Sequence, residues 1–472
     1  MSDNRKSSGI GKSVEDVEVA VIGAGPGGYI AAIRLADLGK QVVLIDEHKD
    51  PGGVCLLEGC IPSKVLINVV ELGNSVKAAE SMGLSVDGLK YDIDKLRFWT
   101  NTVIKRLTGN VRDLLEKRKI RRITGRATFL NNNQLTINDG EQIVNFKNCI
   151  VATGSRINRL PSGYDLPLWS SAEALKLPEI PERLVVIGGG YIGLEMGLVY
   201  SGLGSKVTVV EFSKHLLMSA DADLVDVMVG RCERNLDCIK YESRVKDVKK
   251  NGSGYIVVID NKGQLEEIES DQVLVAIGRC PNTDNIGLEN TEIKIGDRGL
   301  IEVNKECRTS VPHIFAIGDI VPGHALAHKA SREAKVAAEV IANHMVEFDN
   351  HAIPAVVFTD PEIAWCGLTE LEAKKDGIKY NVGKFPLRGL GRAQAIGRTD
   401  GMVKILSDPE TNQVIGVGMV GPHVSELIAE ATLAIQTKVT LEDLMVTIHP
   451  HPTISEAILE AVEITAGVPI HK

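Results

Sequence analysis

The stretch Val17-Glu-Val-Ala-Val-Ile22, followed directly by Gly23-Ala-Gly25-Pro-Gly-Gly28, decides the fold that this sequence predicts. An apolar run that enters a glycine-rich turn, and then an apolar pattern with helical spacing up to Leu38-Gly39, predicts a strand, a tight turn and a helix. A second apolar run, Gln41 to Ile45, ends at Asp46. The segment therefore predicts one βαβ unit with two parallel strands.

The same pattern recurs at a constant offset of 165 residues. The second copy begins with Arg183-Leu-Val-Val-Ile187, turns through Gly188-Gly-Gly-Tyr-Ile-Gly193, and follows a helical pattern to Leu203-Gly204. Its second strand, Lys206 to Val210, ends at Glu211, and in both copies the acidic residue lies 23 residues after the first glycine. Two such copies predict an α/β protein with two Rossmann-like dinucleotide-binding domains.

Each part of the repeat has a physical reason. The first glycine allows the tight turn, the second lets the backbone approach a pyrophosphate, and the third allows the helix to pack closely on the strand. These residues are Gly23, Gly25 and Gly28 in the first copy, and Gly188, Gly190 and Gly193 in the second. The helix N-terminus presents N–H groups to the phosphates. The acidic residues accept hydrogen bonds from ribose hydroxyls, and Glu211 would repel a 2′-phosphate, which favours NAD over NADP.

Two cysteines follow the first copy, in Gly52-Gly-Val-Cys55-Leu-Leu-Glu-Gly-Cys60-Ile-Pro-Ser-Lys64. Their spacing suits a redox-active disulfide, and a chain of 472 residues with 44% hydrophobic residues has a core that needs no structural disulfide. A dithiol downstream of a dinucleotide fingerprint predicts two-electron transfer between thiols and a nicotinamide through a flavin. Glu58, between the cysteines, puts a negative charge beside the dithiol and is expected to raise the thiol pKa values.

Composition limits the partners and the location. The net charge of −9 argues against nucleic acid, and no run of about 18 apolar residues predicts a membrane-spanning helix. Met1 to Glu15 lacks the apolar centre of a secretory signal, and no Cys or His set has the spacing of a zinc site, so no metal is expected. The basic cluster Lys117 to Arg122 is expected to be a solvated helix end. A cytoplasmic location is the simplest interpretation.

Further motifs follow in a fixed order along the chain. They are Ala152-Thr-Gly154, Gly188-Gly-Gly-Tyr-Ile-Gly-Leu-Glu195, Ala276-Ile-Gly-Arg279-Cys-Pro-Asn282, Ala316-Ile-Gly-Asp319, Leu326-Ala-His-Lys-Ala330 and His449-Pro-His-Pro-Thr-Ile-Ser-Glu456. With the dithiol motif, they make the chain resemble the flavin-dependent pyridine nucleotide-disulfide oxidoreductases from Val17 to about Ala466. The stretch beginning at Leu326 resembles the lipoamide branch, the dihydrolipoamide dehydrogenases, rather than the glutathione branch.

The resemblance implies two cofactors, FAD and NAD, and assigns residues to them. Lys64 is expected to reach the flavin and pair with Glu195, and Tyr191 to cover the flavin until nicotinamide arrives. The residues implied for FAD are Gly23, Gly25, Gly28, Asp46, Gly53, Lys64, Ala127, Thr153, Gly154, Asp319 and Ala327. Those implied for the NAD site are Gly188, Gly190, Tyr191, Ile192, Gly193, Leu194, Glu195, Glu211, Val245, Ala276, Ile277, Gly278 and Arg279.

The resemblance also implies four parts of the chain. Residues 1–155 are expected to form the first part of an FAD-binding domain, with the NAD-binding domain, residues 156–280, inserted into it. Residues 281–348 return to the FAD domain, with a strand at Ile314 to Ile317 and a helix at Ala330 to His344. Residues 349–472, with a helix at Val424 to Thr437, are expected to form a C-terminal α+β dimerisation domain.

The implied chemistry is the oxidation of dihydrolipoamide. Cys55 would exchange disulfides with the substrate, and Cys60 would pass the electron pair to the flavin. Because the thiolate is the reactive species, a base is needed. Sequence spacing does not distinguish His449 from His451, but the family match favours His451, oriented by Glu456. In the family this base comes from the other subunit, which implies an obligate homodimer.

The implied partners are lipoylated proteins. They are the lipoyl domains and E2 core of 2-oxo acid dehydrogenase complexes, or the lipoylated H protein of the glycine cleavage system. Within the family, Glu211 disfavours an NADP-linked glutathione-type reductase, and the lack of any cysteine after Cys366 disfavours mercuric reductase. A flavin-binding interaction protein with a vestigial dithiol is the alternative from another functional class.

Overall fold

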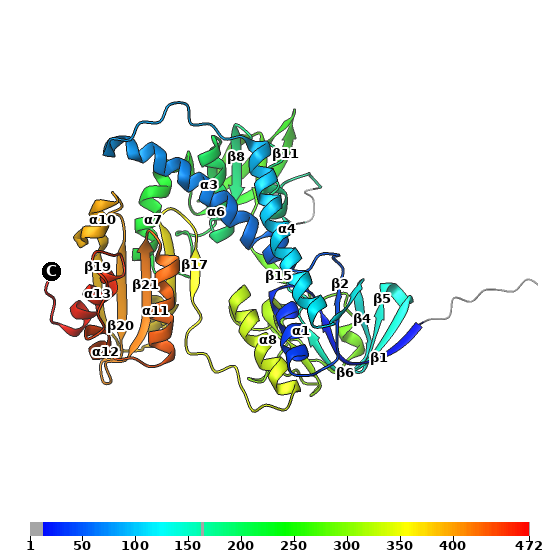
Figure 1. Ribbon diagram of the computed structural model, residues 1–472. Coiled ribbons are helices and arrows are strands. Elements are labelled where there is room, and N and C mark those ends of the chain that lie inside the picture. The colour runs from blue at the N-terminus through cyan, green and yellow to red at the C-terminus, as the bar shows by residue number, and fades with distance from the viewer. Residues whose placement is uncertain (1–12, 162–164, 472) are drawn as a thin grey trace, which may run out of the picture. The chain divides into compact units, whose positions relative to one another are not determined.

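The computed structural model describes residues 13–161 and 165–471, so most of the segment Met1 to Glu15 lies outside the described residues. The chain divides into two compact units (Figure 1). The first unit comprises Met1–Ile61, Asn101–Arg156 and Arg279–Asp349; the second comprises Pro62–Thr100, Ile157–Gly278 and Asn350–Lys472. Each unit contains one glycine-rich fingerprint. The four-part division predicted from the sequence stays a prediction.

The first unit is built on a seven-stranded sheet. Its parallel part has the order β3-β2-β1-β6, with β16 also pairing with β6, and its antiparallel part is the meander β6-β5-β4. The strands are β1 (Ser13–Ile22), β2 (Val42–Asp46), β3 (Arg121–Thr124), β4 (Ala127–Asn131), β5 (Gln134–Ile137), β6 (Gln142–Val151) and β16 (Ile314–Ala316). Strand β1 begins four residues before the predicted Val17, because its first residues pair with β6 from Ser13 onward.

Strand alternation decides what each face of this sheet buries. Val19 and Val21 of β1 contact a core that includes helices α1 (Pro26–Asp37) and α8 (Ala327–Ile341), whereas Ala20 and Ile22 face a second core. Helices α1 and α8 lie side by side (Figure 1). Helix α8 begins and ends three residues before the predicted bounds, Ala330 and His344.

The second fingerprint forms the predicted βαβ unit in the second unit. The parallel sheet has the order β10-β9-β8-β14, and the predicted bounds of both strands and of the helix end are confirmed. The elements are β8 (Arg183–Ile187), α6 (Tyr191–Leu203), β9 (Lys206–Val210), α7 (Ala222–Asn235), β10 (Cys238–Lys240) and β14 (Gln272–Val275). An antiparallel sheet of β11 (Ser243–Asn251), β12 (Gly254–Asn261) and β13 (Gln264–Ser270) lies between β10 and β14 in sequence.

The C-terminal part of the second unit is an antiparallel sheet in the order β17-β18-β21-β20-β19. Ala364 and Cys366 of β18 pack on the core of the C-terminal helices, whereas the alternating residues Ile363 and Trp365 pack on the core that includes α7. The strands are β17 (Ala355–Val357), β18 (Glu362–Gly367), β19 (Asn381–Pro386), β20 (Met402–Ser407) and β21 (Val414–Gly421). The helices are α9 (Glu370–Asp376), α10 (Gly391–Ala395), α11 (Val424–Gln436), α12 (Leu441–Met445) and α13 (Glu456–Ala466).

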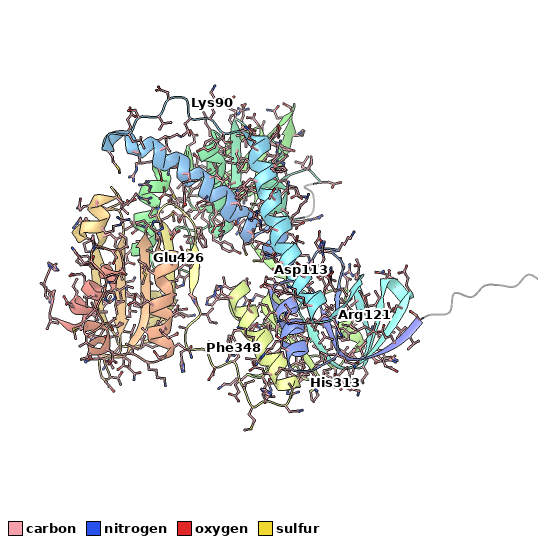
Figure 2. All side chains as sticks on the ribbon, in the orientation of Figure 1. Lys90, Asp113, Arg121, His313, Phe348 and Glu426 are labelled. Atoms are coloured by element: carbon pink, nitrogen blue, oxygen red, sulfur yellow. The ribbon has the colours of Figure 1, made fainter. Side chains whose placement is uncertain are left out.

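The interpretation of the basic cluster as a helix end is only partly correct. Helix α4 (Ile93–Lys117) ends at the first residue of the cluster, but Arg121 already begins strand β3 (Figure 2). Lys119 has a φ of 56°, in the left-handed region, and its N–H donates to the Glu116 oxygen, as is typical of the end of a helix. Arg121 and Arg122 are therefore sheet residues, with Arg121 opposite Val43 of β2 and paired with Glu15.

One described helical stretch, Gly53–Met82, is long and apolar enough to cross a membrane by length and composition, although the sequence predicted no such segment. It comprises α2 (Gly53–Glu58), α3 (Cys60–Ala78) and a short 3₁₀ turn (Ala79–Met82). Leu66, Ile67 and Val70 on α3 are buried in the core of the second unit. These contacts account for part of the apolar composition, since 33% of the apolar window is buried.

Candidate functional site

The first glycine loop excludes side chains at two positions. A Cβ atom on Gly23, whose φ is +99°, would lie 2.2 Å from the Ala152 carbonyl oxygen, and one on Gly28 would lie 1.7 Å from the Gly23 oxygen. Gly25 precedes helix α1, and no side chain caps its first N–H groups. Uncapped N–H groups at a helix N-terminus, beside a loop without side chains, fit a dinucleotide pyrophosphate.

The second glycine loop repeats these contacts. A Cβ on Gly188 (φ +109°) would lie 2.4 Å from the Ala276 oxygen, and one on Gly193 would lie 2.0 Å from the Gly188 oxygen. Helix α6 begins at Tyr191 after Gly190, again with no side-chain cap, and Tyr191 is exposed. The other predicted NAD residues of this unit are buried Leu194, half-buried Ile192 and Val245, and exposed Ile277 before Gly278. This loop also fits a dinucleotide.

The two acidic residues have matching hydrogen bonds. Asp46 accepts from the Ala24 N–H at 2.6 Å and the His48 N–H at 2.7 Å. Glu211 accepts from the Gly189 N–H at 2.7 Å and the Ser213 N–H at 2.6 Å. Both carboxylates are therefore fixed at the end of the second strand, against the glycine turn. Fixed carboxylates in this position suit the ribose hydroxyls.

The cysteine motif begins at the first glycine loop. The Gly52 N–H donates to the Ala24 oxygen at 2.8 Å, and a Cβ on Gly53 would lie 2.6 Å from the Gly25 Cα atom, so the two segments are in close contact. Cys55 is half-buried on α2, and Cys60, the first residue of α3, is exposed. Burial and the nearby Cys55 raise the pKa of the Tyr29 hydroxyl. The start of the dithiol motif therefore contacts the predicted FAD loop.

The predicted pair of Lys64 and Glu195 is present. The Lys64 ammonium donates to both Glu195 oxygens, at 3.1 and 2.9 Å, and the Glu195 side chain is 4% exposed. Phe358, to which the sequence assigned no chemistry, donates its N–H to Glu195 at 3.0 Å, and its ring centroid lies 4.3 Å from the Lys64 nitrogen. The buried carboxylate is therefore satisfied by a cation and a backbone donor.

Asp319 lies in a turn whose backbone is fixed by a buried ion pair. The Gly318 N–H donates to Glu333 at 2.8 Å, and Glu333 pairs with Lys329 at 2.6 Å, both side chains being under a tenth exposed. Ala327 is the first residue of α8, and buried Ala127 is the first residue of β4. The Thr153 hydroxyl donates to the Asn282 carbonyl oxygen, and the Asn282 side-chain amide donates to the Thr153 carbonyl oxygen. Gly154 has a φ of +68°. All these residues belong to the first unit.

The two candidate histidines have different surroundings. Both ring nitrogens of His449 are engaged, by the Thr447 oxygen at 3.1 Å and Glu430 at 2.9 Å, and its side chain is 4% exposed. The Nδ1 atom of His451 lies 2.8 Å from Glu456, and its side chain is 77% exposed. Of these two histidines, His451 is therefore the one that combines an orienting carboxylate with an accessible imidazole. The dithiol belongs to the first unit and this pair to the second.

Comparison with known proteins gives two matches that together cover most of the chain. The family described as pyridine nucleotide-disulphide oxidoreductase matches residues 17–334, and its dimerisation domain matches residues 353–462. The chain belongs to this family. The matches confirm the predicted α/β fold class and the cofactors, FAD and NAD, and they indicate a homodimer.

Relatives and solved structures agree with this family. The chain is 44% identical to dihydrolipoyl dehydrogenase of Geobacillus stearothermophilus, covering 98% of this chain and 99% of the relative. It is 43% identical to dihydrolipoyl dehydrogenase of Vibrio cholerae, covering 95% and 96%. The structure of LpdA from Mycobacterium tuberculosis is 28% identical, with a TM-score of 0.87 and coverage of 95% and 99%. The flavoprotein disulfide reductase RclA from Escherichia coli, at 24% identity, TM-score 0.84 and coverage of 95% and 99%, shares the fold.

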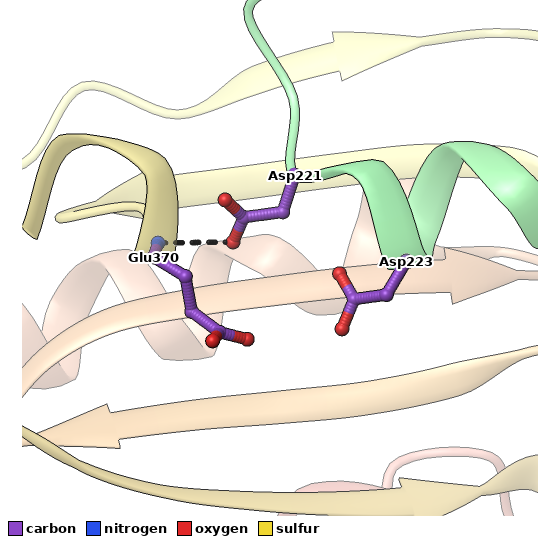
Figure 3. A group of neighbouring side chains, drawn as sticks. All are labelled: Asp221, Asp223 and Glu370. Atoms are coloured by element: carbon purple, nitrogen blue, oxygen red, sulfur yellow. Dashed lines mark hydrogen bonds between the residues drawn. The ribbon is translucent and has the colours of Figure 1, made fainter. Parts of the chain in front are cut away.

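One group of carboxylates in this family member could be mistaken for a metal site. Ligand atoms of Asp221, Asp223 and Glu370 lie within 4.8 Å of one another, and Figure 3 shows the Glu370 N–H donating to Asp221. The buried Lys404 ammonium contacts all three carboxylates, at 2.6, 2.7 and 3.1 Å. Burial alone would raise the pKa of Glu370, but Lys384 and Lys404 lower it to about 2. The group is an ion-pair cluster that joins α7, α9 and β20.

Removing the central lysine is expected to destabilise the second unit strongly. Lys404→Met leaves Asp221, Asp223 and Glu370 without their buried cation, which costs about 3–5 kcal/mol. This should appear as a fall of several degrees in the thermal midpoint, measured by scanning calorimetry at neutral pH. Lys374→Met is the matched control, since its side chain is 68% exposed where it pairs with Glu370. Equal effects of the two substitutions would contradict the account.

Glu71, on helix α3, is expected to make stability depend on pH. Burial, and then the charges of Glu362 and Asp360, raise its pKa to about 7, although Arg398 opposes the rise. Because the folded-state pKa lies above the ordinary 4.5, ionisation is unfavourable in the folded state, and stability falls as pH rises from about 4.5 to about 7.

The substitution Glu71→Gln should remove this loss. The variant gains stability relative to the parent between pH 5 and pH 8, by about 1–2 kcal/mol after allowance for partial exposure. Thermal midpoints across this range measure the gain. Glu80→Gln, at an exposed position in the turn after α3, is the control and should show no such trend. A pH-independent difference for Glu71→Gln would disprove the assignment.

Proposed function

We propose that the protein is an NAD-dependent dihydrolipoyl dehydrogenase that oxidises protein-bound dihydrolipoamide to lipoamide. The observation that carries this proposal is the 44% identity to a dihydrolipoyl dehydrogenase over 98% of the chain, with the dithiol motif held against the first glycine loop. Glu211 is fixed by two N–H groups and supports NAD rather than NADP. The 2′-phosphate of NADP would lie against this fixed carboxylate and be repelled by it.

The proposed steps at the dithiol begin from the oxidised pair. A substrate thiolate attacks Cys55, and Cys60 leaves as a thiolate. The second substrate thiolate then displaces Cys55, which forms lipoamide and leaves a reduced dithiol, so two electrons pass from substrate to enzyme. Bound FAD supplies two-electron transfer between this dithiol and NAD⁺. Lys64, which pairs with Glu195, is the residue that we propose to contact the bound flavin.

His451 is the proposed base for these steps. The imidazole takes the proton of the attacking thiol, while Glu456 holds its Nδ1 atom and so fixes the position of Nε2. Burial alone would raise the pKa of Glu456, but hydrogen bonds from the Thr453 N–H and His451 lower it. Glu456 therefore remains a carboxylate near neutral pH. This supports an orienting role for Glu456.

We place His451 at the dithiol of the partner subunit. The matched dimerisation domain includes His451, and two exposed apolar residues, Val446 and Ile448, precede it in the same segment. Exposed apolar side chains of this kind are typical of an interface.

The proposed partners are the lipoyl domains and E2 core of 2-oxo acid dehydrogenase complexes, or the lipoylated glycine-cleavage H protein. We propose that the protein meets these partners in the cytoplasm.

Steady-state assays with purified holoenzyme test the activity. We expect NADH formation from dihydrolipoamide and NAD⁺, and a much lower rate with NADP⁺. Glutathione disulfide with NADPH should give no turnover. Efficient turnover of glutathione disulfide, or a preference for NADP⁺, would move the protein to another branch of the family. Flavin reduction without turnover would instead support a non-catalytic flavoprotein.

A further inference from the structure

Ser155, for which the sequence analysis predicted no role, connects two predicted cofactor residues. Ser155, which is 5% exposed, donates its hydroxyl hydrogen to Asp319 at 2.5 Å. Arg279 donates from Nε to the Ser155 hydroxyl oxygen at 2.8 Å and from Nη2 to the Ser155 carbonyl oxygen. All three residues belong to the first unit. The resemblance had assigned Asp319 to FAD and Arg279 to NAD.

The direction of these hydrogen bonds follows from the chemistry of each group. Arginine only donates and an ionised carboxylate only accepts, so a hydroxyl between them must accept from Arg279 and donate to Asp319. The single hydroxyl hydrogen is thereby committed to the carboxylate. Hydrogen bonds to charged groups are stronger than those between neutral groups. This series of hydrogen bonds has a charged group at each end, Arg279 and Asp319. The Asp319 oxygen that Ser155 contacts is therefore fixed in position.

We propose that Arg279 and Ser155 are positioning residues of the FAD site, with Arg279 acting through Ser155 on Asp319. The proposal rests on the proposed function, in which Asp319 holds the flavin nucleotide. The Gly318 N–H is already fixed by Glu333, so the main remaining freedom is rotation of the Asp319 side chain. Ser155 removes that freedom, and Arg279 keeps the Ser155 hydroxyl turned toward Asp319.

The test measures FAD release, which does not require turnover. Holoenzyme is placed in concentrated potassium bromide, and the rise in flavin fluorescence gives the release rate. We expect Ser155→Ala and Arg279→Met each to accelerate release about 10-fold, the loss expected for one bond to a charged group. The double variant should release FAD no faster than Ser155→Ala alone, because both substitutions break one chain.

Arg156→Met is the matched control. Arg156 follows Ser155 in the same strand, β7 (Ser155–Ile157), but its guanidinium is exposed and pairs with Asp284 at 2.7 Å. Its loss should leave FAD release unchanged. If Ser155→Ala does not fold, Arg279→Met still decides the question, because half-buried Arg279 lies on the short strand β15 (Arg279–Pro281).

Two results would overturn the proposal. One is that Arg279→Met retains FAD normally but raises the KM for NAD⁺ about 10-fold, which would place Arg279 at the nicotinamide nucleotide. The other is an additive double variant, which would mean that Arg279 acts on FAD independently of Ser155. Neither result bears on whether the parent enzyme oxidises dihydrolipoamide, so a failure here is distinct from a failure of the proposed function.

Discussion

Cys55→Ser and Cys60→Ser are each expected to lower the rate of NADH formation from dihydrolipoamide by at least about 1,000-fold. A serine hydroxyl does not form the disulfide that exchanges with the substrate, so neither variant completes the cycle. FAD should remain bound, because both substitutions leave in place the Gly52 N–H bond to Ala24 and the close backbone contact of Gly53 with Gly25. Stopped-flow and steady-state rates with dihydrolipoamide measure the loss.

Cys238→Ser is the control for these variants. Cys238 is half-buried on β10, and its thiol has no part in the proposed chemistry. The control should turn over at nearly the parent rate. A Cys55→Ser or Cys60→Ser variant that kept more than about a tenth of the parent rate would show that the electron pair does not pass through this dithiol.

His451→Gln is expected to have the second largest effect, a loss of about 100- to 10,000-fold in kcat/KM for dihydrolipoamide. Glutamine keeps a polar side chain of similar size but does not take up the thiol proton. Glu456→Gln should lower kcat/KM by less than His451→Gln does, because the imidazole remains and is only less firmly oriented. His471→Gln is the control, since His471 forms a similar contact with Glu460, at 2.7 Å, outside the proposed site.

A mixed dimer tests whether His451 acts on the partner subunit. If Cys55→Ser and His451→Gln chains are combined at random, half of the dimers carry one of each. When the base comes from the partner, one site of every mixed dimer is intact, and about a quarter of the parent activity returns. When the base acts within its own chain, no mixed dimer has an intact site, and activity stays at the level of the single variants.

Local patterns in the sequence predicted the two βαβ units closely. At Gly23, Gly28, Gly188 and Gly193 a Cβ atom would collide with a backbone oxygen. The backbone geometry of the turn therefore requires glycine at these positions, and their spacing in the sequence predicts the turn. Strand and helix bounds were less well predicted at α8 and β1, where pairing and packing with distant segments decide the ends. The stretch Gly53–Met82 contains no continuous apolar run, because Glu58, Lys64 and Glu71 interrupt it, although its mean hydropathy is high.

Contacts between distant segments were beyond pattern reasoning. The pair of Lys64 and Glu195, which are 131 residues apart, was expected only through the family resemblance. Phe358, Ser155 and Lys404 were missed, because each acts through a neighbour that is more than 100 residues away in sequence. No local signal marks a phenylalanine under a lysine or a serine between two charged groups. The roles given to individual site residues stay predictions.

The central claim is that electrons pass from dihydrolipoamide through the Cys55–Cys60 dithiol and FAD to NAD⁺. The most direct measurement is an anaerobic titration of the holoenzyme with dihydrolipoamide, followed by visible absorbance and then by addition of NAD⁺. We predict a long-wavelength band from a thiolate beside oxidised flavin, which NAD⁺ discharges with stoichiometric NADH formation. Absence of the band, or flavin reduction by NADPH alone, would contradict the account.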